Sequence, residues 1–283
     1  MAIWNLNSRQ VEKSALVGHY AMNQLKVDPF VGSQFIQFAT VGNNASFTVW
    51  RYDTENQELV LYDVKMPKPN WSELHYLSVA FTDSVTAPLS TRSESPSLTN
   101  DAVIGTSDGR LVPFDLMSQK YTELGMISKL TKGEIGVINI ANNSIVLGSS
   151  DGTVAHYPIL GGQISVQDMD TVIKFSVDSA VMAITLDDLN EQGLIGTEAG
   201  NIYYVNFLEA GPIRLVSSNN MNQDAITYIK FDFANPRIFA ASCGQRTEQL
   251  KLSTGENCDE VMNFRSNFEE YGFVVFVIGQ PQF

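Results

Sequence analysis

Cysteine, histidine and basic residues are all scarce in this chain of 283 residues. The two cysteines, Cys243 and Cys258, are too few and too far apart for a zinc or redox motif, so we expect free thiols in a reducing compartment. Lys and Arg number 18 against 31 Asp and Glu, which gives a formal net charge of −13. Because the basic residues are also scattered, the composition argues against binding to nucleic acid or to an anionic membrane.

Long apolar runs are missing as well. The most apolar segment, Phe273–Ile278, is far shorter than the roughly 20 residues that a membrane-spanning helix needs. The first ten residues, MAIWNLNSRQ, contain no apolar core of signal-peptide length. At 44% hydrophobic residues, the chain can nevertheless bury a sizeable core. These observations predict an ordered protein of the cytoplasm.

Signatures of catalysis and of cofactor binding are also absent. The sequence has no Gly-rich nucleotide loop, P-loop, EF-hand loop or His-Glu-x-x-His pattern. His75 and His156 are isolated from any interpretable nucleophile and acid, and the pairs Asp187-Asp188 and Glu269-Glu270 are typical of solvated turns. We therefore predict a non-enzyme with no catalytic, cofactor-binding or metal-binding residues. The sequence does not indicate which residues bind partners.

One strand–turn–strand pattern recurs along the chain. Its three clearest copies are VIGTSDGRLVPFDL (Val103–Leu116), IVLGSSDGTVAHYPIL (Ile145–Leu160) and LIGTEAGNIYYVNFL (Leu194–Leu208), and weaker copies occur at Phe38–Tyr52 and Ile238–Leu252. The turn glycines of the clear copies, at positions 109, 152 and 200, are separated by 43 and 48 residues. A period in the forties that is built from strands is typical of a β-propeller blade.

We therefore predict an all-β fold, a propeller of four-stranded blades that occupies residues 1–283 as a single domain. About five full blades and additional terminal strands are expected. Adjacent Asp-Gly pairs favour tight hairpin turns, so Asp108-Gly109 and Asp151-Gly152 should connect the second and third strands of their blades. The segment 82–100 is rich in Ser, Thr and Pro, and we expect a mobile insertion there, with Ser93 and Ser95 accessible to kinases.

The two ends of the chain look incomplete. Ala2–Leu6 resembles the last strand of a preceding blade, and Phe273–Ile278 has no hairpin partner near it in the sequence. We expect an incomplete propeller, most simply a fragment of a longer tandem-propeller chain. An unpaired apolar strand is an adhesive edge, so Tyr271–Ile278 should be covered by the rest of such a chain or by a partner protein.

Several short motifs together resemble the WD-repeat propellers. They are the pair Gly18-His19, the turn Asp28-Pro29, the Ser-Asp-Gly turns and the strand Phe47–Trp50. No unit ends in Trp-Asp, and Trp4-Asn5 comes closest. In WD repeats the Gly-His histidine is hydrogen-bonded inside the blade, so the resemblance implies a core role for His19. Trp50-Arg51 is only weakly similar to the signature of ubiquitin-ligase substrate receptors.

Divergent repeats of this kind are similar to the cilia- and flagella-associated WD-repeat proteins, which carry tandem propellers on axonemal and centriolar microtubules. The likeness covers about residues 38–233. It implies a non-enzymatic scaffold of the axoneme that binds tubulin, doublet microtubules and neighbouring axonemal proteins within a large assembly. The implied location is the cytoplasm, the cytoskeleton and the cilium, and no nucleic acid or membrane partner is implied.

Two other functions remain open. The chain could be a generic cytosolic WD-repeat adaptor, such as a ubiquitin-ligase or vesicle-coat subunit, or more distantly a propeller hydrolase. Tubulin is acidic, and a chain of net charge −13 would be repelled by it at long range unless its charges are segregated. Docking on a microtubule would then require local basic or apolar patches and several simultaneous partners.

Overall fold

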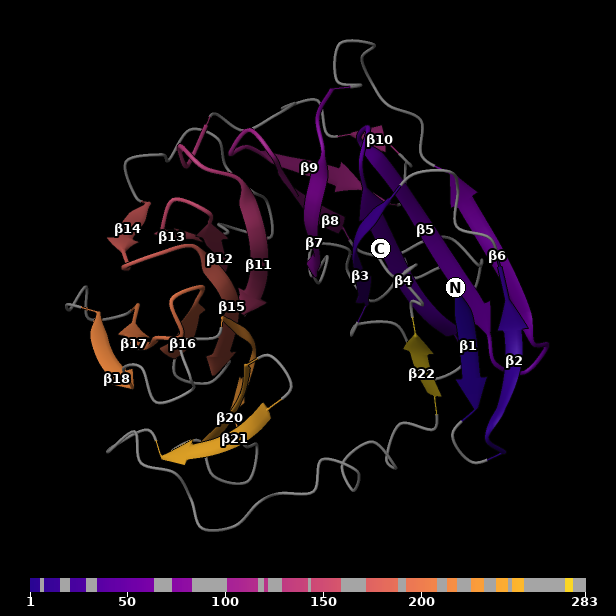
Figure 1. Ribbon diagram of the computed structural model, residues 1–283. Helices are drawn as coiled ribbons and strands as arrows, with labels where there is room; N and C mark the ends of the chain where they lie inside the picture. The colour runs from indigo at the N-terminus through magenta and orange to yellow at the C-terminus, as the bar shows by residue number, and fades with distance from the viewer. Residues whose placement is uncertain are drawn as a thin grey trace, which may run out of the picture.

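In the part of the chain that the structure describes, β-strands form six antiparallel sheets around a common centre (Figure 1). The computed structural model describes residues 1–5, 8–15, 21–28, 35–63, 73–82, 101–116, 120–121, 129–141, 144–158, 172–187, 192–207, 213–217, 225–231, 238–243, 246–251 and 273–276. Within these ranges no helix is long and apolar enough to cross a bilayer. The all-β prediction is confirmed.

Four of the sheets contain four strands each, in the order of the sequence. The first blade has β3 (Met22–Val27), β4 (Phe35–Gly42), β5 (Ser46–Asp53) and β6 (Glu58–Asp63). The second has β7 (Tyr76–Thr82), β8 (Asp101–Thr106), β9 (Leu111–Asp115) and β10 (Lys120–Tyr121). The third has β11 (Ile135–Ala141), β12 (Ser144–Ser149), β13 (Thr153–Pro158) and β14 (Ile173–Ser176). The fourth has β15 (Val181–Asp187), β16 (Gln192–Thr197), β17 (Ile202–Asn206) and β18 (Arg214–Ser217).

These blades have the architecture that the sequence pattern predicts. The turns at Asp108-Gly109 and Asp151-Gly152 join the second and third strands of their blades, as expected. The Ser/Thr/Pro-rich segment connects β7 to β8, the first and second strands of the second blade. Residues 83–100, including Ser93 and Ser95, lie outside the described ranges, so the mobility of this insertion stays a prediction.

The fifth blade has three described strands, β19 (Ile226–Phe231), β20 (Ile238–Cys243) and β21 (Arg246–Lys251). A fourth strand for it would fall outside the described residues. The first strands of the five blades lie against one another in sequence around the centre, β3 on β7, β7 on β11, β11 on β15 and β15 on β19. Within the described residues the ring stays open between the fifth blade and β22, which agrees with the predicted incomplete propeller (Figure 1).

The two terminal segments form the remaining sheet, with strand order β2-β1-β22. It contains β1 (Ala2–Asn5), β2 (Gln10–Ser14) and β22 (Phe273–Phe276), and Ala2 pairs with Phe276. Tyr271–Ile278 was expected to be covered by the rest of a longer chain or by a partner protein; its described part, Phe273–Phe276, pairs instead with β1 of this chain. The blades follow one another around the ring, so the last strand arrives beside the first, a pairing that local sequence patterns do not encode.

A hydrogen-bonded tyrosine connects this terminal sheet to the first blade. The Tyr52 hydroxyl, on β5, donates to the Glu12 carboxylate on β2 at 2.7 Å, and the Asn5 side-chain amide donates to the same carboxylate at 2.6 Å. Burial of Tyr52, followed by the negative charge and hydrogen bonding of Glu12, raises the pKa of the tyrosine to about 12. The phenol therefore keeps its proton and remains a donor at physiological pH.

Consecutive blades come close together at a glycine that precedes the hairpin turn of the second, third and fourth blades. A Cβ added at Gly148 would overlap the Val181 side chain of the next blade, and one at Gly196 would overlap Ile226 in the same way. At Gly105 an added Cβ would lie 2.7 Å from the Ile135 carbonyl oxygen. In all three cases the neighbour is the first residue of the next blade's first strand.

A second glycine, inside the turn, also bonds to the following blade. Gly109, Gly152 and Gly200 have φ values of 82°, 80° and 83°, in the left-handed region that favours glycine. The carbonyl of Gly109 accepts a hydrogen bond from the Leu130 N–H at 3.0 Å, and that of Gly152 accepts one from the Val177 N–H at 2.9 Å. Leu130 and Val177 both lie in the segments that lead into the first strand of the next blade, so the turns are hydrogen-bonded to the connections between blades.

The Asp151 carboxylate organises the turn of the third blade. It accepts hydrogen bonds from the backbone N–H groups of Thr153 at 2.9 Å, Lys132 at 3.1 Å and Gly133 at 3.2 Å. Partial burial on its own would raise the pKa of this carboxyl, but the hydrogen bonds from Thr153, Ser149 and Gly133 outweigh it and hold the pKa below its ordinary value.

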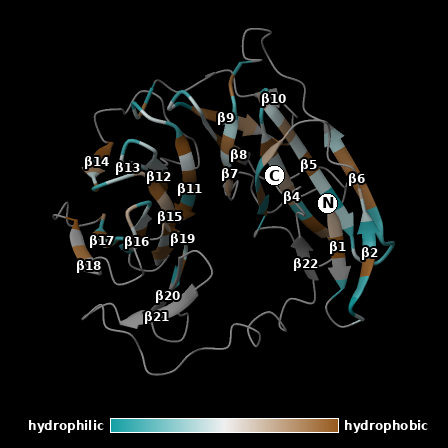
Figure 2. Ribbon diagram, in the orientation of Figure 1, coloured by the Kyte–Doolittle hydropathy of each residue, from teal (hydrophilic) through white to brown (hydrophobic). Residues whose placement is uncertain are grey.

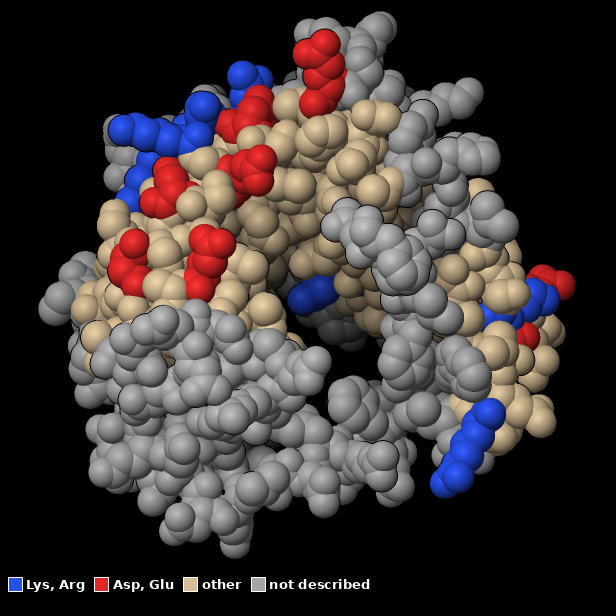
Figure 3. Space-filling model, in the orientation of Figure 1, with Lys and Arg blue, Asp and Glu red and all other residues tan. Residues whose placement is uncertain are grey.

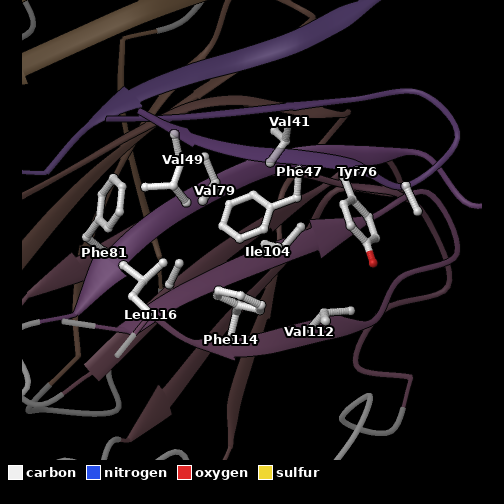
Figure 4. Close-up of a cluster of buried hydrophobic side chains, with 13 residues drawn as sticks. Val41, Phe47, Val49, Tyr76, Val79, Phe81, Ile104, Val112, Phe114 and Leu116 are labelled. Atoms are coloured by element: carbon white, nitrogen blue, oxygen red, sulfur yellow. The ribbon is translucent and has the colours of Figure 1, made fainter. Parts of the chain in front are cut away.

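Hydrophobic side chains fill the space between the blades. Figure 4 shows the cluster between the first two blades, where Phe47 meets the ring of Phe114 edge-on with centroids 5.0 Å apart. Every position of β12 is buried, as in a strand covered on both faces. The exposed strand β2 is mostly hydrophilic by contrast (Figure 2). The core therefore lies between sheets, as the stacking of blades requires.

We predict that Gly148→Ala destabilises the protein by about 1–3 kcal/mol, because the added methyl group overlaps Val181 in a packed core. The matched control is Gly136→Ala, at a site where an added Cβ meets nothing within 4 Å. Urea unfolding should show a lower midpoint at unchanged slope for Gly148→Ala and a midpoint near wild type for the control. Equal midpoints for the two variants would contradict the packing role of Gly148.

A second prediction concerns Asp151→Asn, which places an amide NH₂ among backbone N–H donors. The lowered pKa means that the carboxylate stabilises the fold above the unfolded pKa of about 3.9 and loses this effect as pH falls through the folded pKa. The difference in melting temperature between wild type and Asp151→Asn should be largest near about pH 7 and shrink toward about pH 3. A difference that is constant over this range would show that the carboxylate charge plays no part.

Candidate interaction surface

Two kinds of segment meet at one end of each blade. Because the strands are antiparallel, the residues that precede a first strand lie at the same end as the turn between the second and third strands. Backbone hydrogen bonds join the two segments. The Ser150 N–H donates to the Glu134 carbonyl at 2.9 Å, and the Glu198 N–H donates to the Ala180 carbonyl at 2.8 Å. At this end of the third and fourth blades the turns are thus held by backbone hydrogen bonds.

Acidic side chains occur in both segments of the second, third and fourth blades. We call this set the acidic turn face; it consists of Glu73, Glu134 and Asp178 before the first strands and Asp108, Asp151 and Glu198 in the turns. Figure 3 shows Asp and Glu side chains gathered on this side of the ring, with Lys and Arg beside them toward the outside. In the first blade the corresponding turn carries Asn43 and Asn44 instead.

Three of these carboxylates already have partners in the fold. Asp151 is held by backbone N–H groups, as described above. Asp108 forms an ion pair with Arg110 at 3.1 Å and accepts a hydrogen bond from the Thr106 hydroxyl at 2.6 Å. Asp178 accepts a hydrogen bond from the Asn201 side-chain amide at 2.6 Å. These aspartates therefore stabilise the turns, and much of their charge is already used in contacts within the fold.

The three glutamates of the acidic turn face differ from the aspartates. Glu73, Glu134 and Glu198 are exposed, and within the described ranges none of them forms an ion pair. One comes from each of three consecutive blades, so their charges are spread over the face. These side chains are the ones available to a partner, and they favour a basic one.

Asp178 also influences a neighbouring tyrosine. Partial burial of Tyr203 raises the pKa of its hydroxyl, and the charge of Asp178 adds to this shift. The phenol therefore remains protonated and neutral across the physiological range. In the fourth blade the negative charge of the acidic turn face therefore comes from the carboxylates alone, because Tyr203 adds none.

The histidines are structural where they are described. His156 is buried on β13 and stacks on Phe207 of the fourth blade, with ring centroids 4.7 Å apart. His75 precedes β7; its backbone N–H donates to the Ser107 hydroxyl, and its Nδ1 accepts from the Asn44 N–H at 3.4 Å. The two rings belong to different blades and do not form one site. Gly18-His19 lies outside the described residues.

Trp50 and Arg51 are built into the first blade. The Trp50 indole N–H donates to the Thr40 hydroxyl at 3.1 Å, and its ring stacks with Phe38 at 6.1 Å between centroids. The Arg51 guanidinium lies 3.9 Å from the centre of the Phe35 ring. These contacts give both residues a role in packing.

The remaining sequence candidates do not converge either. Cys243 lies on β20 and Asp187 ends β15, in different blades. Cys258, Asp188 and the pair Glu269-Glu270 lie outside the described residues. In the part of the chain that is described, no group of three or more His, Cys, Asp or Glu side chains could hold a metal ion.

The acidic turn face is what sequence reasoning missed. Each acidic residue is unremarkable alone, and the signal is positional. Glu73, Glu134 and Asp178 all occur one to three residues before a first strand. Comparing the residues before each strand across repeats would have found the set.

The chain is similar to two curated relatives of the same name. WD repeat-containing protein 90 of Xenopus tropicalis is 21% identical over 246 residues, which cover 83% of this chain and 12% of the relative. The protein of that name from Mus musculus is 24% identical over 121 residues, covering 40% of this chain and 6% of the relative. The chain thus spans a small part of the length of these relatives. No family model matches it.

Solved structures show the same architecture. A chain of the Mitotic Checkpoint Complex has a TM-score of 0.55 at 13% identity, with 87% of this chain and 70% of that chain covered. The WD40 β-propeller domain of Doa1 has a TM-score of 0.59 at 11% identity, with 86% and 69% covered. With the repeated blades, the ring of first strands and these likenesses together, the chain has the fold of a WD-repeat β-propeller.

Proposed function

We propose that this chain is a non-catalytic scaffold that binds basic segments of partner proteins on its acidic turn face, and that it serves in the ciliary axoneme beside doublet microtubules. The observation that supports binding is the regular display of Glu73, Glu134 and Glu198 by three consecutive blades. WD-repeat propellers generally act through protein–protein contacts, and the fold places this chain among them.

The rigidity of the face favours binding. The Ser150 hydroxyl and the Asp151 carboxylate hold the segment before β11, because they accept hydrogen bonds from the backbone N–H groups of Glu134, Lys132 and Gly133. Because the turns are already fixed, little conformational entropy is lost in ordering them when a partner binds. The glutamates keep their own rotational freedom and can adjust to a basic segment.

The negative charge of the acidic turn face determines which partners it can bind. An acidic face attracts lysine- and arginine-rich segments and repels acidic surfaces at distances of about a Debye length. Since tubulin is acidic, contact with the microtubule itself would use other surfaces of the ring. The acidic turn face would then hold basic segments of neighbouring axonemal proteins, which agrees with a position within a multi-protein assembly.

The axonemal assignment rests on the resemblance of the repeats to the cilia- and flagella-associated WD-repeat proteins. A cytosolic adaptor with the same face is the competing function. The two differ in where the chain is retained. An axonemal scaffold should co-purify with salt-washed doublet microtubules, whereas an adaptor should remain in soluble complexes.

We predict that Glu134→Lys/Glu198→Lys lowers capture of partners from an axonemal extract by at least about tenfold, since the face changes from attractive to repulsive for basic segments. The matched control is Glu55→Lys/Glu58→Lys, which makes the same change of charge at the β5–β6 turn. Quantitative mass spectrometry of captured proteins measures the effect, and thermal melting checks that both variants fold. Equal loss in the two variants would point to net charge alone and contradict the proposed face.

A further inference from the structure

Three exposed lysines gather where the second and third blades adjoin. Lys129 and Lys132 belong to the segment that leads into β11, and Lys174 lies on β14, the last strand of the third blade. The Lys174 ammonium donates a hydrogen bond to the Leu130 carbonyl at 2.9 Å, which places its charge beside that segment. We call Lys129, Lys132 and Lys174 the basic rim.

The backbone of this segment is held from both sides. The N–H groups of Leu130 and Thr131 donate to the carbonyl of Gly109, in the turn of the second blade, at 3.0 and 3.4 Å. The N–H of Lys132 donates to the carboxylate of Asp151, in the turn of the third blade, at 3.1 Å. Leu130 and Thr131 are also buried. The lysines on either side of them therefore project from a fixed backbone.

The neighbouring aspartates leave the charge of the basic rim uncompensated. Asp108, on the side of the second blade, forms its ion pair with Arg110 at 3.1 Å. Asp151, on the side of the third blade, accepts hydrogen bonds from three backbone N–H groups. Among the described residues, no carboxylate forms an ion pair with any lysine of the basic rim. Its positive charge is therefore available to a partner.

Acidic and basic side chains are separated along the radius of the ring. Glu134, the acid that follows Lys132 most closely in the chain, directly precedes β11, the strand of its blade nearest the centre. Lys174 is on β14, at the other edge of the same sheet. Figure 3 shows Lys and Arg side chains outside the Asp and Glu side chains on this part of the ring. A chain of net charge −13 thus has a positive outer edge here.

We propose that the basic rim binds an acidic, glutamate-rich segment of a partner protein in an extended conformation. Side chains on one side of an extended peptide recur at about 7 Å. The Cα atoms of Lys129 and Lys132, three residues apart, are separated by at most about 10 Å, so successive carboxylates can reach both ammonium groups. The Lys174 ammonium has two N–H donors beyond the one that binds Leu130.

The surroundings of the basic rim favour a peptide over a nucleic acid. A duplex carries about one negative charge per 1.7 Å of its axis, and the acidic turn face beside the rim would repel it. A single extended peptide is narrow enough to follow the lysines alone. This inference goes beyond the proposed function, because it concerns a second surface of the opposite charge.

Fluorescence anisotropy of a labelled octaglutamate peptide, titrated with the full chain at about 50 mM salt, tests the proposal. Saturable binding is expected. Lys129→Glu/Lys132→Glu should weaken it by at least about tenfold, because two attractive charges become repulsive. The matched control is Arg9→Glu/Lys13→Glu, which makes the same change of charge at exposed residues of the terminal segment. Its affinity should stay within about threefold of that of wild type, because distant charges are screened.

A further variant separates this proposal from the proposed function. Glu134→Lys/Glu198→Lys, which reverses charge on the acidic turn face, should bind octaglutamate at least as tightly as wild type, because it removes repulsion. Loss of partner capture in that variant with octaglutamate binding retained would show that the two surfaces act separately. Weaker octaglutamate binding in it would contradict the basic rim as the binding site.

Three other results would overturn the proposal. They are an absence of saturable binding, unchanged affinity in Lys129→Glu/Lys132→Glu, and equal weakening in that variant and its control. Tighter binding of an oligothymidylate of the same length than of octaglutamate would replace the acidic peptide by a nucleic acid. Thermal melting checks that every variant folds, which is expected of Lys129→Glu/Lys132→Glu because both side chains are exposed.

Discussion

Close contact between successive blades depends on the absence of a side chain at one position in the hairpins of the second, third and fourth blades. At Gly148 and Gly196 the next blade's first residue, Val181 or Ile226, fills the space that a Cβ would take. The β-branched side chain of one blade thus fits over the backbone of its neighbour, and the hydrophobic core can close around it. A few residues later, Gly152 turns the chain and offers its carbonyl to the same neighbour. One short stretch of sequence therefore sets both the packing and the hydrogen bonding between blades.

This arrangement also explains why the exposed face is so regular. The segments that precede the first strands are fixed by the turn glycines of the previous blade and by the turn of their own blade. Any residue placed there therefore has a defined backbone position. Aspartates such as Asp151 hold the turn itself, while the carboxylates of Glu134 and Glu198, which form no ion pair among the described residues, can bind something outside the molecule. Residues that stabilise the turns and residues that are exposed to a partner therefore lie close together at the same end of each of these blades.

The predictable part of this protein is the part that repeats locally. The turns at Asp108-Gly109 and Asp151-Gly152 can be predicted because an adjacent Asp and Gly favour a tight turn with positive φ in any surroundings. The pairing of Ala2 with Phe276 depends on where the whole ring brings the chain, and no local pattern contains it. The register shifts near the start of the first strands, as between Met22 and Gln24 in β3, are equally non-local, since they appear only when strands pair. Side-chain identity was visible in the sequence, but proximity was not.

The pairing of β1 with β22 has a consequence for the order in which the protein folds. Each of the first four blades closes through hairpins between neighbouring strands, at a small loss of chain entropy. The terminal sheet instead joins residues from the two extremes of the described chain, and its contacts have the longest sequence separation in the fold. Contacts of this kind form late, because closing the long loop costs chain entropy before the contact itself contributes any stabilising free energy. On a ribosome the inner blades would therefore assemble while β1 is paired with β2 alone, before β22 has been synthesised.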